Sequence, residues 1–251
     1  MKRMAPVPDM NREIGMGELG IIELVHMLAE NRLLVPSFQR EFVWEPEDII
    51  KLWDSIYRFY PIGSLLCWET HVYLRIHRRA GGHILPDEGT NVDKSKRWLY
   101  ILDGQQRATA LLVSILGEKA KAAKRRDFDY TLYFDAIGGT FFFGNELGRH
   151  KKHVDQAFLI RLKDIYEKRS DFPDSISADT GCSQGVENHL IRLYRVFLDY
   201  KIPLIRIRGF DIPAVREIFE RINQEGKSLK SIDIMIARTF QNYDYMVEEG
   251  L

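Results

Sequence analysis

The sequence has few cysteines and no excess of charge of either sign. Cys67 and Cys182 are the two cysteines in 251 residues, so one disulfide is possible but a disulfide-rich scaffold is excluded. A structural zinc site needs more ligands than these, and we expect reduced thiols and no zinc. Basic and acidic residues each number 36. This balance argues against nonspecific coating of nucleic acid, which relies on a strong positive field, but it allows a local basic site.

Long apolar segments and the common nucleotide-binding signatures are also missing. The N-terminal residues MKRMAPVPDMNREIG are basic but contain no apolar signal-peptide region. No segment reaches the ~18 apolar residues of a membrane span. The chain contains no GxxxxGK[ST] motif, no GxSxG motif and no kinase signature. We therefore predict a soluble, cytoplasmic protein with no membrane partner that is not a P-loop NTPase.

The patterning predicts helices and strands that are interspersed without strict alternation. Hydrophobic residues make up 45% of the chain, which is enough for a sizeable core. Apolar spacing predicts helices at 18–30, 46–56, 105–116, 155–168, 186–200, 211–223 and from 231 onward. Short apolar runs predict strands at 63–69, 98–102, 130–134, 140–143 and 202–207. The expected fold class is α+β, or mixed α/β, after a flexible arm at the N-terminus.

The clearest candidate site is the segment 103–107, DGQQR, at the junction of a strand and a helix. A buried strand over 98–102 delivers Asp103 and Gly104, and a helix begins at once. Backbone N–H groups at a helix start have no partner within the helix, and the helix dipole adds positive potential there. Gly104 permits a tight turn and close approach of a ligand. This junction is therefore typical of a phosphate site.

The side chains of this segment suit the same chemistry. Gln105 and Gln106 offer amide donors, and Arg107 offers a planar fork that matches phosphate. Asp103 is suited to hold Mg²⁺ or to act as a base. The alternative is structural: an N-cap aspartate, a turn glycine and surface amides.

Two further segments carry candidate residues. Gln39 and Arg40 lie in the aromatic stretch VPSFQREFVW, where an arginine head group needs a phosphate or a carboxylate partner. The alternative for Arg40 is a purely structural ion pair. Asn223 ends a predicted helix as a candidate polar ligand, and Lys227 is a candidate phosphate contact. The alternative for this segment is an ordinary helix C-cap at Gly226.

Three segments together resemble a known family. They are VPSFQREFVWEPEDIIKLWDSIYRFYPIGSLLCWE, WLYILDGQQRATALL and IFERINQEGKSLKSIDI, in this order. This combination resembles the DUF262 domain, the N-terminal part of GmrSD-like, modification-dependent restriction and phage-defence proteins. The resemblance covers roughly residues 18–240. It implies an arm at 1–17, one domain at 18–240 and a tail at 241–251, after which a further domain can follow.

The resemblance implies a fold, a ligand and a partner. The fold is a ParB/sulfiredoxin-like core with additional helices, in which a nucleotide phosphate lies at a helix start after a strand. The implied activity is hydrolysis of a nucleoside triphosphate with Mg²⁺, coupled to cleavage of DNA, including modified DNA. Cleavage is expected from an HNH-type nuclease domain or partner subunit, which this chain does not match. The chain is then either part of a longer protein or a protein that needs a partner.

The expected site gathers residues from all three segments. Asp103, Gln106 and Arg107 are assigned to catalysis, with Asp103 as the Mg²⁺ ligand. The residues expected to bind the nucleotide or its phosphates are Gln39, Arg40, Gly104, Gln105, Arg107, Asn223 and Lys227. The alternative function is a ParB-like module that binds DNA, or senses modified DNA, without NTP turnover. A scaffold subunit with a vestigial pocket is the third possibility.

Overall fold

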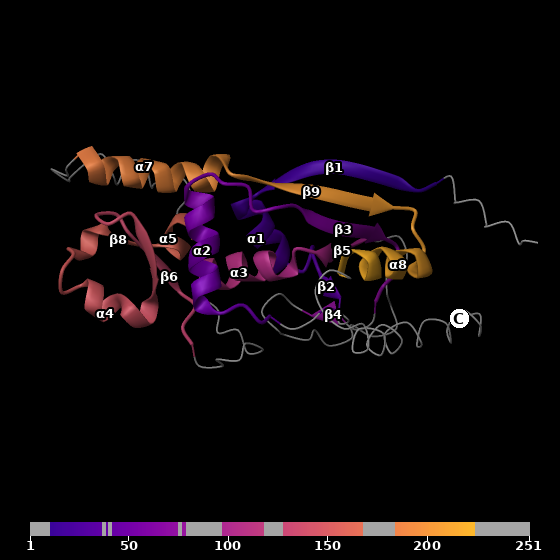
Figure 1. Ribbon diagram of the computed structural model, residues 1–251, viewed down its shortest axis with the longest axis horizontal. Helices are drawn as coiled ribbons and strands as arrows, with labels where there is room; N and C mark the ends of the chain where they lie inside the picture. The colour runs from indigo at the N-terminus through magenta and orange to yellow at the C-terminus, as the bar shows by residue number, and fades with distance from the viewer. Residues whose placement is uncertain are drawn as a thin grey trace, which may run out of the picture.

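The main element of the fold is a mixed four-stranded sheet. The computed structural model describes residues 11–36, 39, 42–74, 77–78, 97–117, 128–167 and 184–223. The strands of this sheet, in spatial order, are β1 (Glu13–Gly20), β9 (Lys201–Arg208), β3 (Leu65–Thr70) and β5 (Trp98–Asp103). β3 and β9 run parallel, and the two outer strands run antiparallel to their neighbours (Figure 1).

Helices cover both faces of this sheet because its strands are apolar on both sides. Along β3, Leu65 and Cys67 face one way and Trp68 faces the other, as strand alternation requires. The first face packs against α1 (Ile21–Ala29) and α3 (Gln105–Leu116). The second face packs against α8 (Ile212–Asn223), which therefore lies across the sheet from them.

A second lobe is built around a small antiparallel sheet. Its strands, in spatial order, are β7 (Thr140–Phe143), β6 (Leu132–Asp135) and β8 (Leu159–Arg161). The helices around it are α2 (Pro46–Tyr57), α4 (Leu147–His150), α5 (Leu162–Glu167) and α7 (Gln184–Asp199). The remaining described elements are β2 (Val35–Pro36), β4 (His77–Arg78), η1 (Gly144–Glu146) and η2 (Gln156–Phe158). One hydrophobic cluster runs from the main sheet into this lobe, so both parts share a core.

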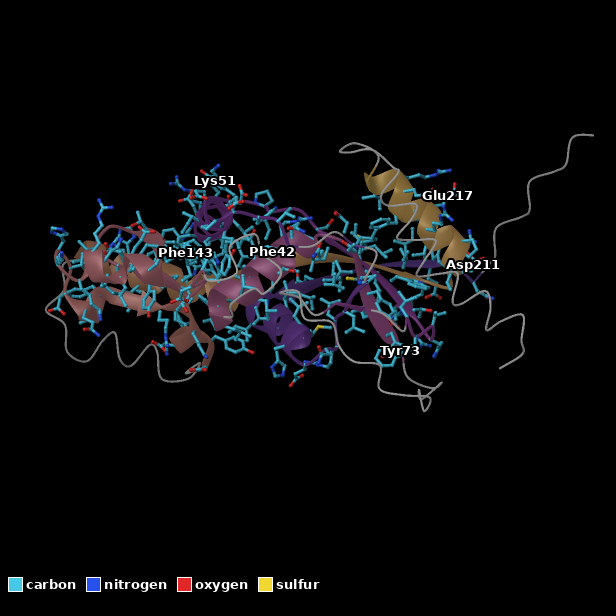
Figure 2. The ribbon with its side chains drawn as sticks, turned by 90° about the horizontal axis from the view of Figure 1, so that it is seen from below. Phe42, Lys51, Tyr73, Phe143, Asp211 and Glu217 are labelled. Atoms are coloured by element: carbon cyan, nitrogen blue, oxygen red, sulfur yellow. The ribbon has the colours of Figure 1, made fainter. Side chains whose placement is uncertain are left out.

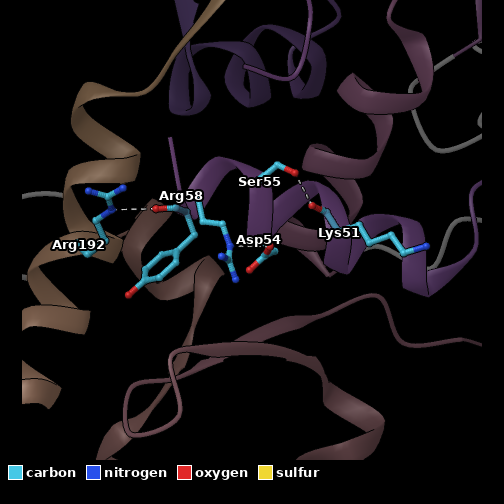
Figure 3. Close-up of polar contacts among 6 residues, drawn as sticks. Lys51, Asp54, Ser55, Arg58 and Arg192 are labelled. Atoms are coloured by element: carbon cyan, nitrogen blue, oxygen red, sulfur yellow. Dashed lines mark hydrogen bonds and ion pairs between the residues drawn. The ribbon is translucent and has the colours of Figure 1, made fainter. Parts of the chain in front are cut away.

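Polar contacts fasten α2 to α7. Arg192 Nε donates a hydrogen bond of 2.8 Å to the carbonyl oxygen of Tyr57 at the end of α2 (Figure 3). The Tyr57 hydroxyl lies 2.6 Å from Nδ1 of His189, whose ring stacks on the tyrosine ring. Burial, partly offset by Arg192, raises the pKa of Tyr57 above its usual value. The helix that precedes β3 is thereby held in place by the second lobe.

Most expected elements are confirmed, and the mixed α/β class is confirmed. Pro46 lies in the first turn of α2, where Glu45 and Asp48 form a capping box. Gly117 ends α3 with a φ of 69°. The hairpin of β6 and β7 turns at 136–139. Local signals of capping and turn chemistry were therefore sufficient for these elements.

Predictions are wrong in two places. The flexible arm at 1–17 includes Glu13–Gly17, which belong to β1, and the first helix begins at Ile21 rather than residue 18. Residues 1–10 lie outside the described part. The helix expected over 155–168 is a 3₁₀ turn, a strand and the short helix α5. In both places pairing with a strand distant in sequence overrides the local pattern, which is the usual limit of such arguments.

The last predicted helix and the tail at 241–251 lie outside the described residues. Within the described part, no helix combines the length and the apolar character needed to cross a membrane.

Candidate functional site

The strand-to-helix junction predicted at 103–107 is present. β5 ends at Asp103, and Gly104 is the N-cap of α3 with a φ of 90°. Because glycine has no side chain, the N-cap residue makes no side-chain hydrogen bond to the helix start. The expected alternative, in which Asp103 is the N-cap, is therefore wrong. The Asp103 side chain is 48% exposed beside this helix start.

The three glutamines of the predicted site are buried and make contacts within the protein. Gln39 Nε2 donates hydrogen bonds of 2.7 and 2.8 Å to the carbonyl oxygens of Ile101 and Leu102. These bonds hold the segment after β2 against the end of β5. Each buried amide is thus at least partly satisfied, as the cost of burying an unpaired polar group requires.

Gln105 and Gln106 continue this network at the helix start. Gln106 Nε2 donates to Gln105 Oε1 at 2.9 Å, and Gln106 Oε1 accepts from the backbone N–H of Val43 at 3.0 Å. The chain before α2 is thus tied to the first turn of α3. The glutamine side chains therefore shape the junction from within the protein.

Arg107 fixes the loop that leads into β3. Its Nη1 donates to the carbonyl oxygen of Ile62, and its Nη2 donates to that of Ser64 at 2.9 Å. Nη2 also lies 3.6 Å from the Asp103 carboxylate. The side chain is 20% exposed. One face of the guanidinium fork is therefore used by backbone carbonyls, while its positive charge stays at the helix start.

Gly104 is required by packing as well as by its backbone conformation. A Cβ atom at this position would lie 2.5 Å from Cδ2 of Leu65 and 3.3 Å from the carbonyl oxygen of Ser64. The space that a side chain would take is thus filled by the start of β3. This packing requirement adds to the tight turn that the sequence predicts for Gly104.

The remaining predicted site residues are not joined to this cluster by any described contact. Asn223 is the last residue of α8, and its side chain is outside the description. Arg40 and Lys227 also lie outside the described residues. The structure therefore brings together Gln39 and the segment 103–107.

Asp103 fits a Mg²⁺ ion that is bound mainly by a substrate. Among the described residues, no group of three or more histidine, cysteine, aspartate or glutamate side chains is placed to hold a metal. Mg²⁺ in phosphate-transferring sites needs one or two carboxylates, because substrate phosphates and waters fill its other positions. The exposed carboxylate of Asp103 meets that limited requirement.

Sequence reasoning missed a second polar site at the far end of the main sheet. A pocket of about 510 Å³ is lined by Asn11, Glu13, Glu69, Thr70, His71, Arg97, Arg208, Gly209 and Phe210. The alternation of Arg206 and Arg208 in β9 was the available signal, since both arginines point to the face that Glu69 shares.

Glu69 is the centre of this second site. Its Oε1 lies 3.0 Å from Arg97, and its Oε2 lies 2.9 Å from Arg208 and 3.4 Å from Arg206. Burial alone would raise the pKa of the Glu69 carboxyl, but hydrogen bonds from Arg208 and Arg97 outweigh burial and lower it. The carboxylate is therefore ionised at neutral pH.

Comparison with known proteins agrees with the resemblance of the three sequence segments. The chain is 24% identical to an uncharacterized protein of the archaeon Methanocaldococcus jannaschii, over 88% of this chain and 41% of the length of that protein. The chain thus spans less than half of that relative. The model of the "GmrSD restriction endonuclease, N-terminal domain" family matches residues 21–240, which include the whole β5–α3 junction. The chain therefore belongs to the GmrSD restriction endonuclease N-terminal domain family.

Proposed function

We propose that this chain is the nucleotide-binding domain of a restriction or phage-defence system, and that it hydrolyses a nucleoside triphosphate at the junction of β5 and α3. The family match supports membership of a restriction system. The observation that carries the nucleotide proposal is the 48% exposed Asp103 side chain beside a helix start whose N-cap residue, Gly104, has no side chain to cap it. A helix start of this kind binds phosphate through its backbone N–H groups and its dipole.

The proposed roles follow from where each side chain lies. The first turn of α3 holds a phosphate through its backbone, and Arg107 contributes positive charge while it positions the loop before β3. Asp103 orients water or binds Mg²⁺, which would offset phosphate charge when bound. Gln39 and Gln106 act as positioning residues, because their amides tie the surrounding segments to β5 and α3.

DNA cleavage is proposed to come from another part of the system. The archaeal relative extends well beyond the matched region, since the match covers 41% of it. An HNH-type nuclease domain or subunit in that position would act on DNA while this domain binds the nucleotide. The cytoplasm is the proposed location, since restriction systems act on DNA there.

The test is release of inorganic phosphate from each of the four ribonucleoside triphosphates with Mg²⁺. Asp103→Asn should abolish turnover. Asp199→Asn is the matched control, because Asp199 is 49% exposed and also pairs with an arginine four residues away. Turnover that survives Asp103→Asn would overturn the catalytic role of Asp103. Nucleotide binding without turnover in the wild-type chain would favour the ParB-like binding module instead.

A further inference from the structure

The arginine pocket at the far end of the main sheet is assembled where the ends of all four strands meet. The ends of β3 and β9 supply Glu69 and Arg208, the start of β1 supplies Glu13, and Arg97 lies directly before β5. Figure 2 labels Tyr73 and Asp211, which follow β3 and β9, at this end of the molecule and far from Phe143. The pocket is therefore a product of the tertiary fold.

This pocket is distinct from the proposed nucleotide site. Arg97 immediately precedes β5, and Asp103 ends it. Six residues of strand at about 3.3 Å each separate their α-carbons by about 20 Å. One phosphate group cannot contact both places, so a ligand of the pocket would be separate from one at Asp103.

The charge of the pocket favours an anion. Arg97 and Arg208 line the pocket together with Glu69 and Glu13, and Arg206, which is not part of the lining, adds a third guanidinium to the Glu69 cluster. These three arginines and two carboxylates together carry a net positive charge of one. Nε of Arg206 and of Arg208 is buried without a hydrogen-bond partner among the described residues, so each of these arginines offers a ligand only its outer N–H groups.

The arginines are held in place yet remain accessible. Glu69 is 11% exposed, whereas the side chains of Arg97, Arg206 and Arg208 are 58%, 35% and 40% exposed. The largely buried carboxylate of Glu69 thus orients three guanidinium groups whose outer N–H groups face solvent. On β1, Gly15 is the partner of Arg206 and carries no side chain that could cover it. Planar guanidinium groups in such an arrangement match the oxygens of phosphate.

We infer that this pocket binds a phosphate group of a nucleotide, either free or within a nucleic-acid strand. Its volume of about 510 Å³ is within the range of small-molecule sites. Thr70, His71 and Asn11 line it and bring groups that hydrogen-bond sugar or base. The inference names a second ligand-binding site and does not depend on nucleotide binding at Asp103.

The experiment measures binding of a labelled single-stranded oligonucleotide, the matching duplex and adenosine monophosphate as the free nucleotide. Arg208→Gln should weaken binding about tenfold. It should also reduce the magnitude of the slope of log affinity against log salt concentration by about one. Arg195→Gln is the matched control, because Arg195 pairs with one carboxylate on α7 in the other lobe. Binding of the strand or of the monophosphate identifies the source of the phosphate, and either result supports the inference.

A second variant tests the pocket by a gain of affinity. Glu13→Gln removes an exposed carboxylate from the lining and should tighten binding severalfold, whereas Glu187→Gln on α7 should not. Unchanged affinity in both Arg208→Gln and Glu13→Gln would overturn the inference.

A measurement on the wild-type chain covers the case in which Arg208→Gln does not fold. In amide hydrogen exchange, the same ligands should protect 69–71 and 208–210. Protection confined to 103–107 would overturn the inference and support the proposed nucleotide site. Protection of the pocket supports the inference whether or not 103–107 is also protected, and the phosphate-release assay tests the nucleotide proposal separately.

Discussion

The guanidinium of Arg107 donates a hydrogen bond of 2.9 Å to the backbone carbonyl oxygen of Ser64, across 43 residues of chain. A second bond from the same side chain reaches the carbonyl of Ile62. The arginine of the DGQQR segment is thus a structural residue in addition to any role in binding. A change at Arg107 would therefore alter both the stability of the fold and any binding at the site, so the two effects have to be measured separately.

Arg107→Ala should lower the free energy of unfolding by about 2 kcal/mol, because two backbone carbonyls lose a charged donor. Arg58→Ala is the control, since Arg58 forms an exposed ion pair with Asp54, and such pairs contribute little to stability. Urea denaturation without nucleotide measures both. Equal stability of Arg107→Ala and the wild type would contradict the structural role.

Gly104→Ala should destabilise the chain by about 2 kcal/mol, because a φ of 90° is strained for alanine and its Cβ would press on Leu65. Gly17→Ala is the matched control. No atom lies within 4 Å of a Cβ at Gly17, so alanine there should be neutral or stabilise β1 by about 0.5 kcal/mol. Thermal unfolding of the two variants checks the contrast, and a similar loss in both would refute this account of Gly104.

The helices, the hairpin and the DGQQR junction could be predicted because their signals are local. Pro46, Gly117 and the apolar spacing of α7 each act within a few residues of chain. β1 could not be predicted from EIGMGELG, because its first six residues are exposed and its glycines have low strand propensity. Only its pairing with β9, nearly the whole described chain away, makes it a strand.

The candidate site was predictable in part for the same reason. That Asp103 and Gly104 lie at a helix start follows from sequence order, and the resemblance linked Gln39 to them. The partners of Arg107 and Gln106 are backbone groups of Ser64 and Val43, and no side-chain pattern reports such contacts. The arginine pocket was missed because its residues gather where the ends of four strands meet.

Glu69→Gln should destabilise the chain at neutral pH by about 2 kcal/mol, because three arginines then lose their shared carboxylate. The pKa of Glu69 is lower in the folded chain than in the unfolded chain. The ionised carboxylate therefore stabilises the fold fully at pH values above the unfolded pKa, and this stabilisation is lost as the pH falls through the folded pKa. The difference in the free energy of unfolding between Glu69→Gln and the wild type should therefore shrink at acid pH, below the usual glutamate pKa of about 4.3.

Chemical denaturation at a series of pH values measures this difference. Glu217→Gln serves as the control, because Glu217 is 61% exposed in its pair with Arg221. A gap between Glu69→Gln and the wild type that widens in acid would contradict the sign of the pKa shift.

The Cys67 thiol should be inert in the folded chain. Burial, slightly offset by Arg206, raises the pKa of Cys67 to about 12, so almost no reactive thiolate exists at neutral pH. In a Cys182→Ser background, an aromatic disulfide reagent should label Cys67 only after denaturant is added. Equal labelling rates in the native and denatured chain would show that β3 is not buried as described.

The most direct test of the central claim is the melting temperature of the chain with Mg²⁺ and each of ATP, GTP, CTP and UTP. Wild type, Asp103→Asn and the matched control Asp199→Asn are compared, because Asp103 forms one long ion pair among the described residues and its change leaves the Arg107 loop contacts intact. A nucleotide at ~100 times its Kd adds about 2.7 kcal/mol of stability. We predict a rise with at least one nucleotide in the wild type and in Asp199→Asn that is lost in Asp103→Asn. No rise with any nucleotide, or the same rise in Asp103→Asn, would contradict a nucleotide site at the start of α3.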